Sequence, residues 1–121
     1  MDVSNKEKFN KIIEKIKNSN TIVIVEGKKD RAALGSMGIS NITELTKKPL
    51  YQIVEDIFNS NNECVILTDL DKKGREIYGK LSSDLQKRGI KINNNLRDFL
   101  FKNTKLRQIE GLASYMENNS L

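Results

Sequence analysis

Two aspartates separated by one residue follow an apolar run in the segment "CVILTDLDKKGREI", which spans residues 64–77. The apolar residues predict a buried strand over residues 64–68, and side chains two apart on a strand point the same way. Asp69 and Asp71 are therefore expected to share a face, where their like charges repel each other. The repulsion is relieved if one carboxyl is protonated, if both are well solvated, or if a cation lies between them. The cation is the working hypothesis.

A third carboxylate ends another predicted strand. The β-branched run "TIVIVEG", residues 21–27, stops at Glu26 and Gly27. Ligands of open parallel sheets bind at the carboxyl ends of the strands, so Glu26, Asp69 and Asp71 are expected to converge there. An oxygen-rich set of ligands without histidine suits Mg²⁺, and Mn²⁺ is expected to substitute for it. The sequence thus predicts a magnesium site.

Glycines and basic residues surround the three acids. Gly27 and Gly74 are expected to let the backbone approach a substrate closely. The predicted phosphate-binding or nucleic-acid-binding side chains are Lys28, Lys29, Lys72, Lys73 and Arg75. Acids for a metal beside bases for a phosphate is the arrangement that phosphodiester chemistry requires. Taken singly, each feature also has a structural explanation, because an aspartate can cap a helix, a glycine can serve a turn, and lysines can form a solvated rim.

The composition limits the classes of function. The chain has 121 residues, 37% hydrophobic and 31% charged, which is typical of one globular domain. It has no histidine and one cysteine, which excludes a histidine-based relay, a zinc site and an internal disulfide. The formal charge of +5 favours a polyanionic partner, nucleic acid first. No apolar run approaches the roughly 20 residues needed to cross a bilayer, so no membrane association and a cytoplasmic location are expected.

Predicted strands alternate with predicted helices along the chain. Strands are expected at residues 21–27, 39–45, 64–68 and 90–92. Helices are expected at residues 4–18, 49–58 and 74–88, and a short helix is expected after residue 28, with Asp30 as its N-cap. A helical extension follows at residues 95–119. The pattern predicts a single α/β domain, residues 1–121, that is Rossmann-like, with a roughly four-stranded, mainly parallel sheet and helices on both faces.

The two acidic segments together resemble a known family. "IVIVEGKKD" and "VILTDLDKKG" resemble the Toprim domain of topoisomerases, bacterial-type primases, recombination mediators and several nucleases. Its hallmarks, Glu-Gly after the first strand and Asp-x-Asp-x-x-Gly after a later one, match Glu26-Gly27 and residues 69–74. The resemblance covers roughly residues 21–92. It implies a compact α/β fold in which Asp69 and Asp71 hold Mg²⁺ while Glu26 is a general acid/base or a further ligand.

The segment "VEGKKD" is also similar to the Toprim ribonucleases that mature ribosomal RNA, in which a basic residue and an acid follow the Glu-Gly. On that resemblance Lys28 and Asp30 are further catalytic candidates. The chain departs from other Toprim classes, because none of its tyrosines lies in a recognisable nucleophile context and "GKKD" is not a P-loop. The resemblance therefore implies a small stand-alone Toprim protein.

Two functions remain open. The first is Mg²⁺-dependent phosphodiester chemistry by a nuclease or RNA-processing enzyme. The second is a non-catalytic, metal-dependent nucleic-acid-binding or assembly module of a repair, replication or RNA-processing complex. Because the chain is short, a homodimer or a protein partner is expected to complete the groove for RNA or DNA. A phosphatase of the haloacid-dehalogenase type also begins with Asp-x-Asp, but Lys72 and Lys73 replace its Gly-Thr.

The C-terminal segment lies outside the resemblance and has two interpretations. Its basic and aromatic side chains could contact nucleic acid. Alternatively, Leu96, Phe99, Leu100 and Leu106 dock on the core and leave the charges in water. We favour docking. The charged residues concerned are Arg97, Lys102, Lys105 and Arg107.

Overall fold

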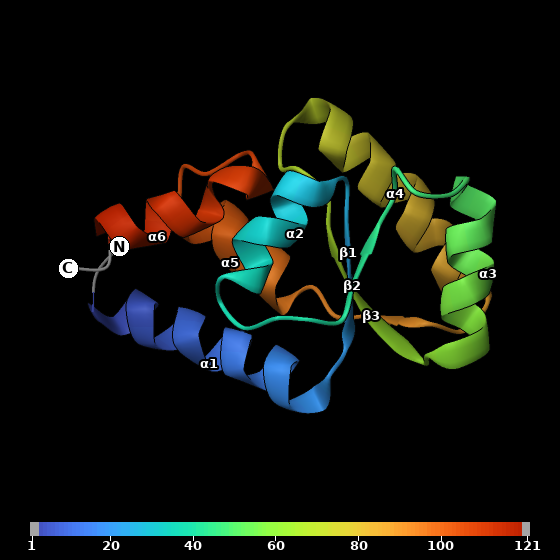
Figure 1. Cartoon of the computed structure of the whole chain (residues 1–121), viewed down its shortest axis with the longest axis horizontal. Helices are drawn as coiled ribbons and strands as arrows, with labels where there is room; N and C mark the ends of the chain where they lie inside the picture. The colour runs from blue at the N-terminus through green and yellow to red at the C-terminus, as the bar shows by residue number, and fades with distance from the viewer. Residues whose placement is uncertain (1–2, 120–121) are drawn as a thin grey trace.

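Four parallel strands form a sheet in the order β2-β1-β3-β4 (Figure 1). The computed structural model describes residues 3–119, and the side chains of residues 4–117. The strands are β1 (Ile22–Val25), β2 (Ile42–Glu44), β3 (Glu63–Leu67) and β4 (Lys91–Ile92). The predicted α/β fold with a four-stranded parallel sheet is confirmed.

Helices cover both faces of the sheet (Figure 1). One face carries α1 (Val3–Ser19), α2 (Lys28–Gly35), α5 (Asn95–Asn103), the 3-10 turn η1 (Ile109–Gly111) and α6 (Leu112–Asn119). The other carries α3 (Leu50–Ser60) and α4 (Lys72–Lys87). None of the helices in the described part of the chain has the length and apolar character needed to span a membrane.

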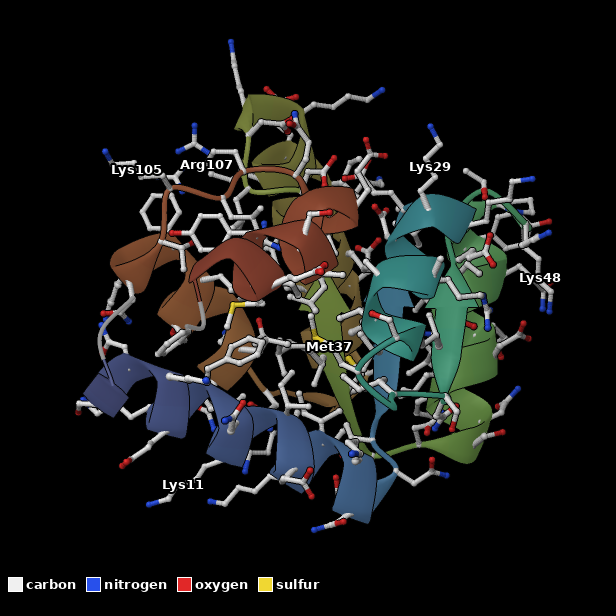
Figure 2. The ribbon with its side chains drawn as sticks, turned by 60° about the vertical axis from the view of Figure 1, so that its left-hand side comes forward. Lys11, Lys29, Met37, Lys48, Lys105 and Arg107 are labelled. Atoms are coloured by element: carbon white, nitrogen blue, oxygen red, sulfur yellow. The ribbon has the colours of Figure 1, made fainter. Side chains whose placement is uncertain are left out.

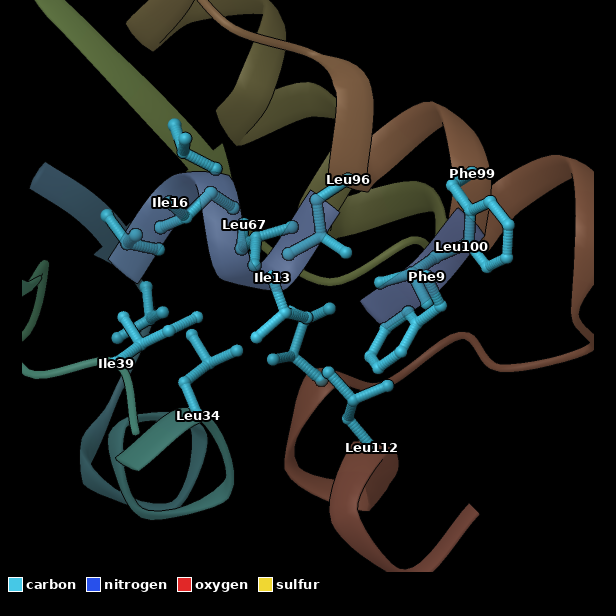
Figure 3. Packing of buried hydrophobic residues seen from close by; sticks show 14 of the residues in the cluster. Phe9, Ile13, Ile16, Leu34, Ile39, Leu67, Leu96, Phe99, Leu100 and Leu112 are labelled. Carbon is cyan, nitrogen blue, oxygen red and sulfur yellow. The ribbon is translucent and has the colours of Figure 1, made fainter. Parts of the chain in front are cut away.

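Alternation along the two central strands creates two hydrophobic clusters. Val23 and Val25 of β1 belong to the larger cluster, whereas Ile24 between them belongs to the smaller one on the opposite face. In the larger cluster Phe9 of α1 packs against Phe99 of α5, with 5.9 Å between the ring centroids (Figure 3). Both faces of the sheet are therefore buried, which explains why its strands read as continuous apolar runs.

The chain changes direction between β1 and β3. From β1 it passes through α2 to β2 on one side, and from β3 it passes through α4 to β4 on the other side. The connections diverge at the carboxyl ends of these two neighbouring strands. A crevice at such a switch point is the usual ligand site of an open α/β sheet.

The central strands end earlier than the sequence predicts. β1 ends at Val25 and β3 at Leu67, so Glu26, Asp69 and Asp71 lie in the loops that follow. The strand alternation used to place Asp69 and Asp71 on one face therefore does not apply to them. The predicted N-cap role of Asp30 is also wrong, because Gly27 is the N-cap of α2 and Asp30 lies in its first turn.

Candidate functional site

A hydrogen bond joins the two acidic segments at the carboxyl edge of the sheet. Oε2 of Glu26 accepts a hydrogen bond of 2.7 Å from the backbone N–H of Asp69. The parallel register, in which Val25 pairs with Leu67, places the two loops side by side and makes this bond feasible. The expected meeting of Glu26 and Asp69, which lie 43 residues apart, therefore occurs at the switch point.

The aspartate pair has structural hydrogen bonds of its own. Oδ1 of Asp69 accepts from the N–H of Ile109 at 2.8 Å, and Oδ1 of Asp71 accepts from the N–H of Gly74 at 2.9 Å. Asp71 is thus the N-cap of α4. Its Oδ2 accepts a longer bond of 3.3 Å from Nε2 of Gln108. Within the described residues 3–119, Oε1 of Glu26 and Oδ2 of Asp69 accept no hydrogen bond.

Gly74 is required by packing. A Cβ atom at this position would lie 2.0 Å from the backbone oxygen of Asp69, which no real Cβ tolerates. The hydroxyl of Thr68 donates to the carbonyl of Gly74 at 2.6 Å and holds the first turn of α4 against the loop. Gly27 differs, since a Cβ there would meet open space. Gly74 therefore positions Asp69 and Asp71, in addition to any contact with a substrate.

Burial and neighbouring acids raise the pKa values of Asp30 and Asp69. Burial is the main cause of the raised pKa of Asp69; the hydrogen bond from Ile109 opposes it, and repulsion by Asp71 and Glu110 adds to it. Burial also raises the pKa of Asp30, whose carboxylate accepts a bond of 3.1 Å from the N–H of Gly27 and is repelled by Asp69. A cation placed among such groups would be attracted to all of them.

Arg97 of α5 lies beneath the acids and is only 7% exposed. Its guanidinium donates to the carbonyls of Thr68 at 2.7 Å and Asp69 at 3.1 Å, and lies 4.6 Å from the ring centroid of Tyr78. Burial lowers the pKa of Arg97, while Tyr78, Glu26 and Asp69 raise it. The expectation that the charges of the C-terminal segment stay in water is therefore wrong for this residue.

The C-terminal segment closes the site. Docking of α5 is confirmed, because Leu96, Phe99 and Leu100 are buried. Beyond α5, the carbonyl of Arg107 accepts a bond of 2.7 Å from the N–H of Leu70, between the two aspartates. Together with the bonds from Ile109 and Gln108, this contact ties residues 107–109 to the acidic loop. Sequence reasoning missed these contacts, and no pattern in the sequence signals them, because two of the three are made by the backbone.

Basic side chains flank the acidic loops. The predicted residues Lys28, Lys29, Lys72, Lys73 and Arg75 are all exposed, in the first turns of α2 and α4. Figure 2 shows Lys29, Lys105 and Arg107 projecting from the same side of the molecule, whereas Lys11 lies on the opposite side. Basic side chains in the first turns of α2 and α4 therefore flank the acidic loops, as expected for a phosphate-bearing ligand.

Two carboxylates of the site, those of Glu26 and Asp69, are suited to bind Mg²⁺. Among the described residues, no group of three or more Asp, Glu, Cys or His side chains is arranged to hold a metal ion. Magnesium in proteins takes one or two carboxylates and completes its shell with waters and substrate phosphates. Glu26 and Asp69 offer such a pair, since each has an oxygen outside the protein's hydrogen bonds. Each carboxylate oxygen of Asp71 already accepts one hydrogen bond, so Asp71 is less free to bind a metal than Glu26 or Asp69.

Similar proteins come from archaea and bacteria. No family model matches the chain. A UPF0292 protein of Methanocaldococcus jannaschii is 34% identical over 116 residues, which cover 91% of each chain. Another, from Pyrococcus horikoshii, is 36% identical over 98 residues, covering 80% of this chain and 74% of the relative. A solved structure of a protein from Aquifex aeolicus superposes with a TM-score of 0.77 and 29% identity, covering 86% of this chain and 94% of that one.

Proposed function

The chain belongs to the UPF0292 family. Because two acidic segments flanked by basic residues meet at its switch point, we propose that it is a magnesium-dependent phosphodiesterase acting on nucleic acid. The reaction class is that of a nuclease or RNA-processing enzyme of the Toprim type. We further propose a cytoplasmic location and a groove completed by a second copy or a protein partner.

One observation carries the proposal. The hydrogen bond from Asp69 to Glu26 brings together, at the switch point, the two acidic segments on which the Toprim resemblance rests. A structural role alone would be satisfied by any acceptor for the N–H of Asp69. Two further acids, Asp30 and Asp71, lie in the adjoining turns; both make structural hydrogen bonds, and both add to the electrostatic repulsion that a cation would relieve.

The residues have distinct roles in this proposal. Glu26 and Asp69 would hold Mg²⁺, which supplies charge neutralisation at the scissile phosphate and a water of lowered pKa. Lys28, Lys72 and Arg75 would bind the phosphate oxygens from the first turns of two helices, whose N-terminal dipoles also favour an anion. Asp30, whose pKa is raised by burial, is suited to hold a proton for the leaving oxygen.

Replacing Glu26 by glutamine tests the chemistry. The amide oxygen can still accept from the N–H of Asp69, so Glu26→Gln is expected to fold and to bind uncleaved substrate normally. A neutral amide oxygen binds Mg²⁺ much more weakly than a carboxylate, so turnover is expected to fall strongly. Labelled single- and double-stranded RNA and DNA would be incubated with Mg²⁺ or Mn²⁺ and each variant. Turnover by Glu26→Gln equal to that of the wild type contradicts the assigned role.

The matched control for charge is Glu55→Gln. Glu55 is a partly exposed acid of α3 that pairs with Arg88 at 2.7 Å, on the other face of the sheet. The same loss of one negative charge at this position is expected to leave turnover unchanged. Calorimetric titration with MgCl₂ provides a second measurement, in which Asp69→Asn is expected to abolish the binding seen with the wild type.

The non-catalytic binding module is favoured by a different observation. Asp71 caps α4 and accepts from Gln108, so the pair of aspartates that the Toprim resemblance assigns to the metal is partly engaged in structure. A binding module predicts that oligonucleotides bind with strong salt dependence and that no cleavage occurs even with Mn²⁺. Cleavage that disappears in Glu26→Gln excludes it.

A further inference from the structure

A pocket of about 290 Å³ adjoins the acidic loops, between α4 and α5. We refer to it as the base pocket, and it is lined by Leu70, Arg75, Tyr78, Arg97, Asp98, Phe101 and Lys102. Two of these residues also belong to the acidic site, because Leu70 lies between the two aspartates and Arg97 donates to the carbonyl of Asp69. The base pocket therefore shares part of its wall with the loop that carries Asp69.

Aromatic rings and cations form the walls of the base pocket. Phe101 is a large apolar residue left 46% exposed, and the guanidinium of Arg107 lies 4.8 Å from its ring centroid. Tyr78 is held in place by its hydroxyl, which donates to Asn94 at 2.8 Å, and by Arg97 over its ring. The pocket thus combines the ring of Tyr78, whose orientation is held by these contacts, with the exposed ring of Phe101.

The charge of the base pocket selects among flat ligands. Arg75 and Lys102 line it, Arg107 lies over Phe101, and Asp98 is the single acid of the lining. This balance favours a ligand that is flat and apolar in one part and anionic in another. A nucleobase attached to its phosphodiester has both properties, and ring stacking together with a cationic track is the usual way in which proteins hold single strands. A pocket of this volume lies at the small end of ligand sites, which suits one base.

We propose that the base pocket holds one unstacked nucleobase of a single-stranded nucleic acid, and that the adjoining phosphate lies at the Glu26–Asp69 edge. The inference rests on the proposed function and specifies its substrate. A base inside a duplex would first have to be unstacked and unpaired, which costs free energy. Single strands and unpaired segments are therefore the substrate class.

Removing one exposed ring tests the base pocket. The substitution Phe101→Leu keeps an apolar side chain and removes the stacking surface. The matched control is Phe58→Leu, because Phe58 is 44% exposed and has Arg88 at 5.2 Å from its ring centroid, on α3. Binding of a fluorescein-labelled oligodeoxyadenylate of about twelve nucleotides would be followed by anisotropy in EDTA, so that cleavage plays no part.

Phe101→Leu is expected to weaken binding of the single strand by between about 5-fold and about 100-fold, the range found for a stacked base. Phe58→Leu is expected to leave the affinity unchanged. An oligonucleotide with abasic sites should bind the wild type as weakly as the normal strand binds Phe101→Leu, with no further loss in the variant. Lys102→Gln, which removes a charge from the rim, should lower the salt dependence of binding by about one ion.

Some outcomes would overturn the inference. Equal affinities of Phe101→Leu and Phe58→Leu, equal affinities of normal and abasic strands, or competition by polyglutamate as effective as that by the oligonucleotide would each exclude a base in this pocket. Cleavage that requires Glu26 together with an unchanged affinity of Phe101→Leu would leave the proposed function standing and remove the base pocket. Base-dependent binding without any cleavage would support the base pocket and contradict the proposed function.

Discussion

The two ends of the sheet share several features, yet only one of them has the composition of a reaction site. At the amino end a hollow of about 560 Å³ is lined by residues 19–21 and 58–63, and at the carboxyl end the base pocket measures about 290 Å³. Each hollow includes an exposed phenylalanine, Phe58 or Phe101, beneath an arginine. A hollow and a stacked ring are therefore not enough to identify a functional site.

The difference lies in the charged residues. The amino-end hollow is lined mainly by serine, threonine and asparagine, and Glu63 is its one acid. At the carboxyl end Asp30 and Asp69 have raised pKa values, and the buried Arg97 donates to the carbonyl of Asp69. Converging charges that burial perturbs are costly to the fold, which is why they mark functional sites more often than volume does.

A perturbed pKa without convergence carries no such meaning. Burial raises the pKa of the Cys64 thiol to about 12, with a smaller effect from Glu63. Cys64 lies in the middle of the sheet and packs with Ile24 and Ile66. A buried thiol of this kind is an inert core residue. What distinguishes the carboxyl end is that several groups with shifted pKa values lie at one edge of the sheet.

The largest effect on stability is expected at Gly74. Gly74→Ala would bring a methyl group against the backbone of Asp69, where no flexible side chain can give way, and is expected to destabilise the fold by about 3 kcal/mol or more. Gly79→Ala on the same helix meets open space and is expected to stabilise by roughly 0.5 to 1 kcal/mol. Urea unfolding measures both. Equal effects of the two substitutions would contradict the close approach of α4 to the acidic loop.

Substitutions of Arg97 and Arg88 compare a buried arginine at the carboxyl end with an exposed one elsewhere on the protein. Arg97→Met leaves the carbonyls of Thr68 and Asp69 without their donor, and is expected to cost about 3 kcal/mol. Arg88→Met removes an exposed ion pair with Glu55, and is expected to cost less than about 1 kcal/mol. Both would be measured by urea unfolding. A cost for Arg97→Met as small as that for Arg88→Met would show that its guanidinium is not a structural donor.

Asp71 separates capping from metal binding. Asp71→Ala removes the bond to the N–H of Gly74 and is expected to cost about 1 kcal/mol, whereas Asp71→Asn retains a capping oxygen and should be nearly neutral. Calorimetry with MgCl₂ would then compare Asp71→Asn with Asp69→Asn. We expect the loss of affinity to be smaller at position 71. The opposite order would make Asp71 the principal ligand and Glu26–Asp69 a structural contact.

The fold could be predicted because its signals are local and repeated. The apolar runs place the strands and helices within a few residues. Glycine, which tolerates the left-handed backbone that often follows a helix, stands at 38 and 89 with φ values of +91° and +80°. Parallel pairing follows from the alternation of strands with helices. The acids were correctly assigned to the carboxyl edge because sheet topology alone brings the ends of β1 and β3 together.

The detailed geometry of the site depends on contacts that no local pattern encodes. The loop after β3 and the N-terminus of α4 determine the orientation of Asp69 and Asp71. Strand alternation does not determine it, because β3 ends at Leu67. Arg97 looked like a surface charge because its sequence neighbours give no sign of the carbonyls above it. Its partners are 28 and 29 residues away and come from the backbone, which offers no residue type to recognise.

Asp69 at the carboxyl end and Asp56 on α3 should make the stability of the fold depend on pH in opposite directions. The raised pKa of Asp69, caused mainly by burial, means that the folded state retains its proton above the ordinary value of 3.8, so stability falls as the pH rises through that range. Hydrogen bonds from Lys48 and Gln52 lower the pKa of the exposed Asp56 on α3, so its contribution is present above 3.8 and is lost as the pH falls below it. In EDTA, Asp69→Asn should therefore gain stability relative to the wild type with rising pH, whereas Asp56→Asn should lose it. Urea unfolding over a pH series measures both, and slopes of the same sign would show that the carboxyl end is no more costly in charge than an ordinary surface.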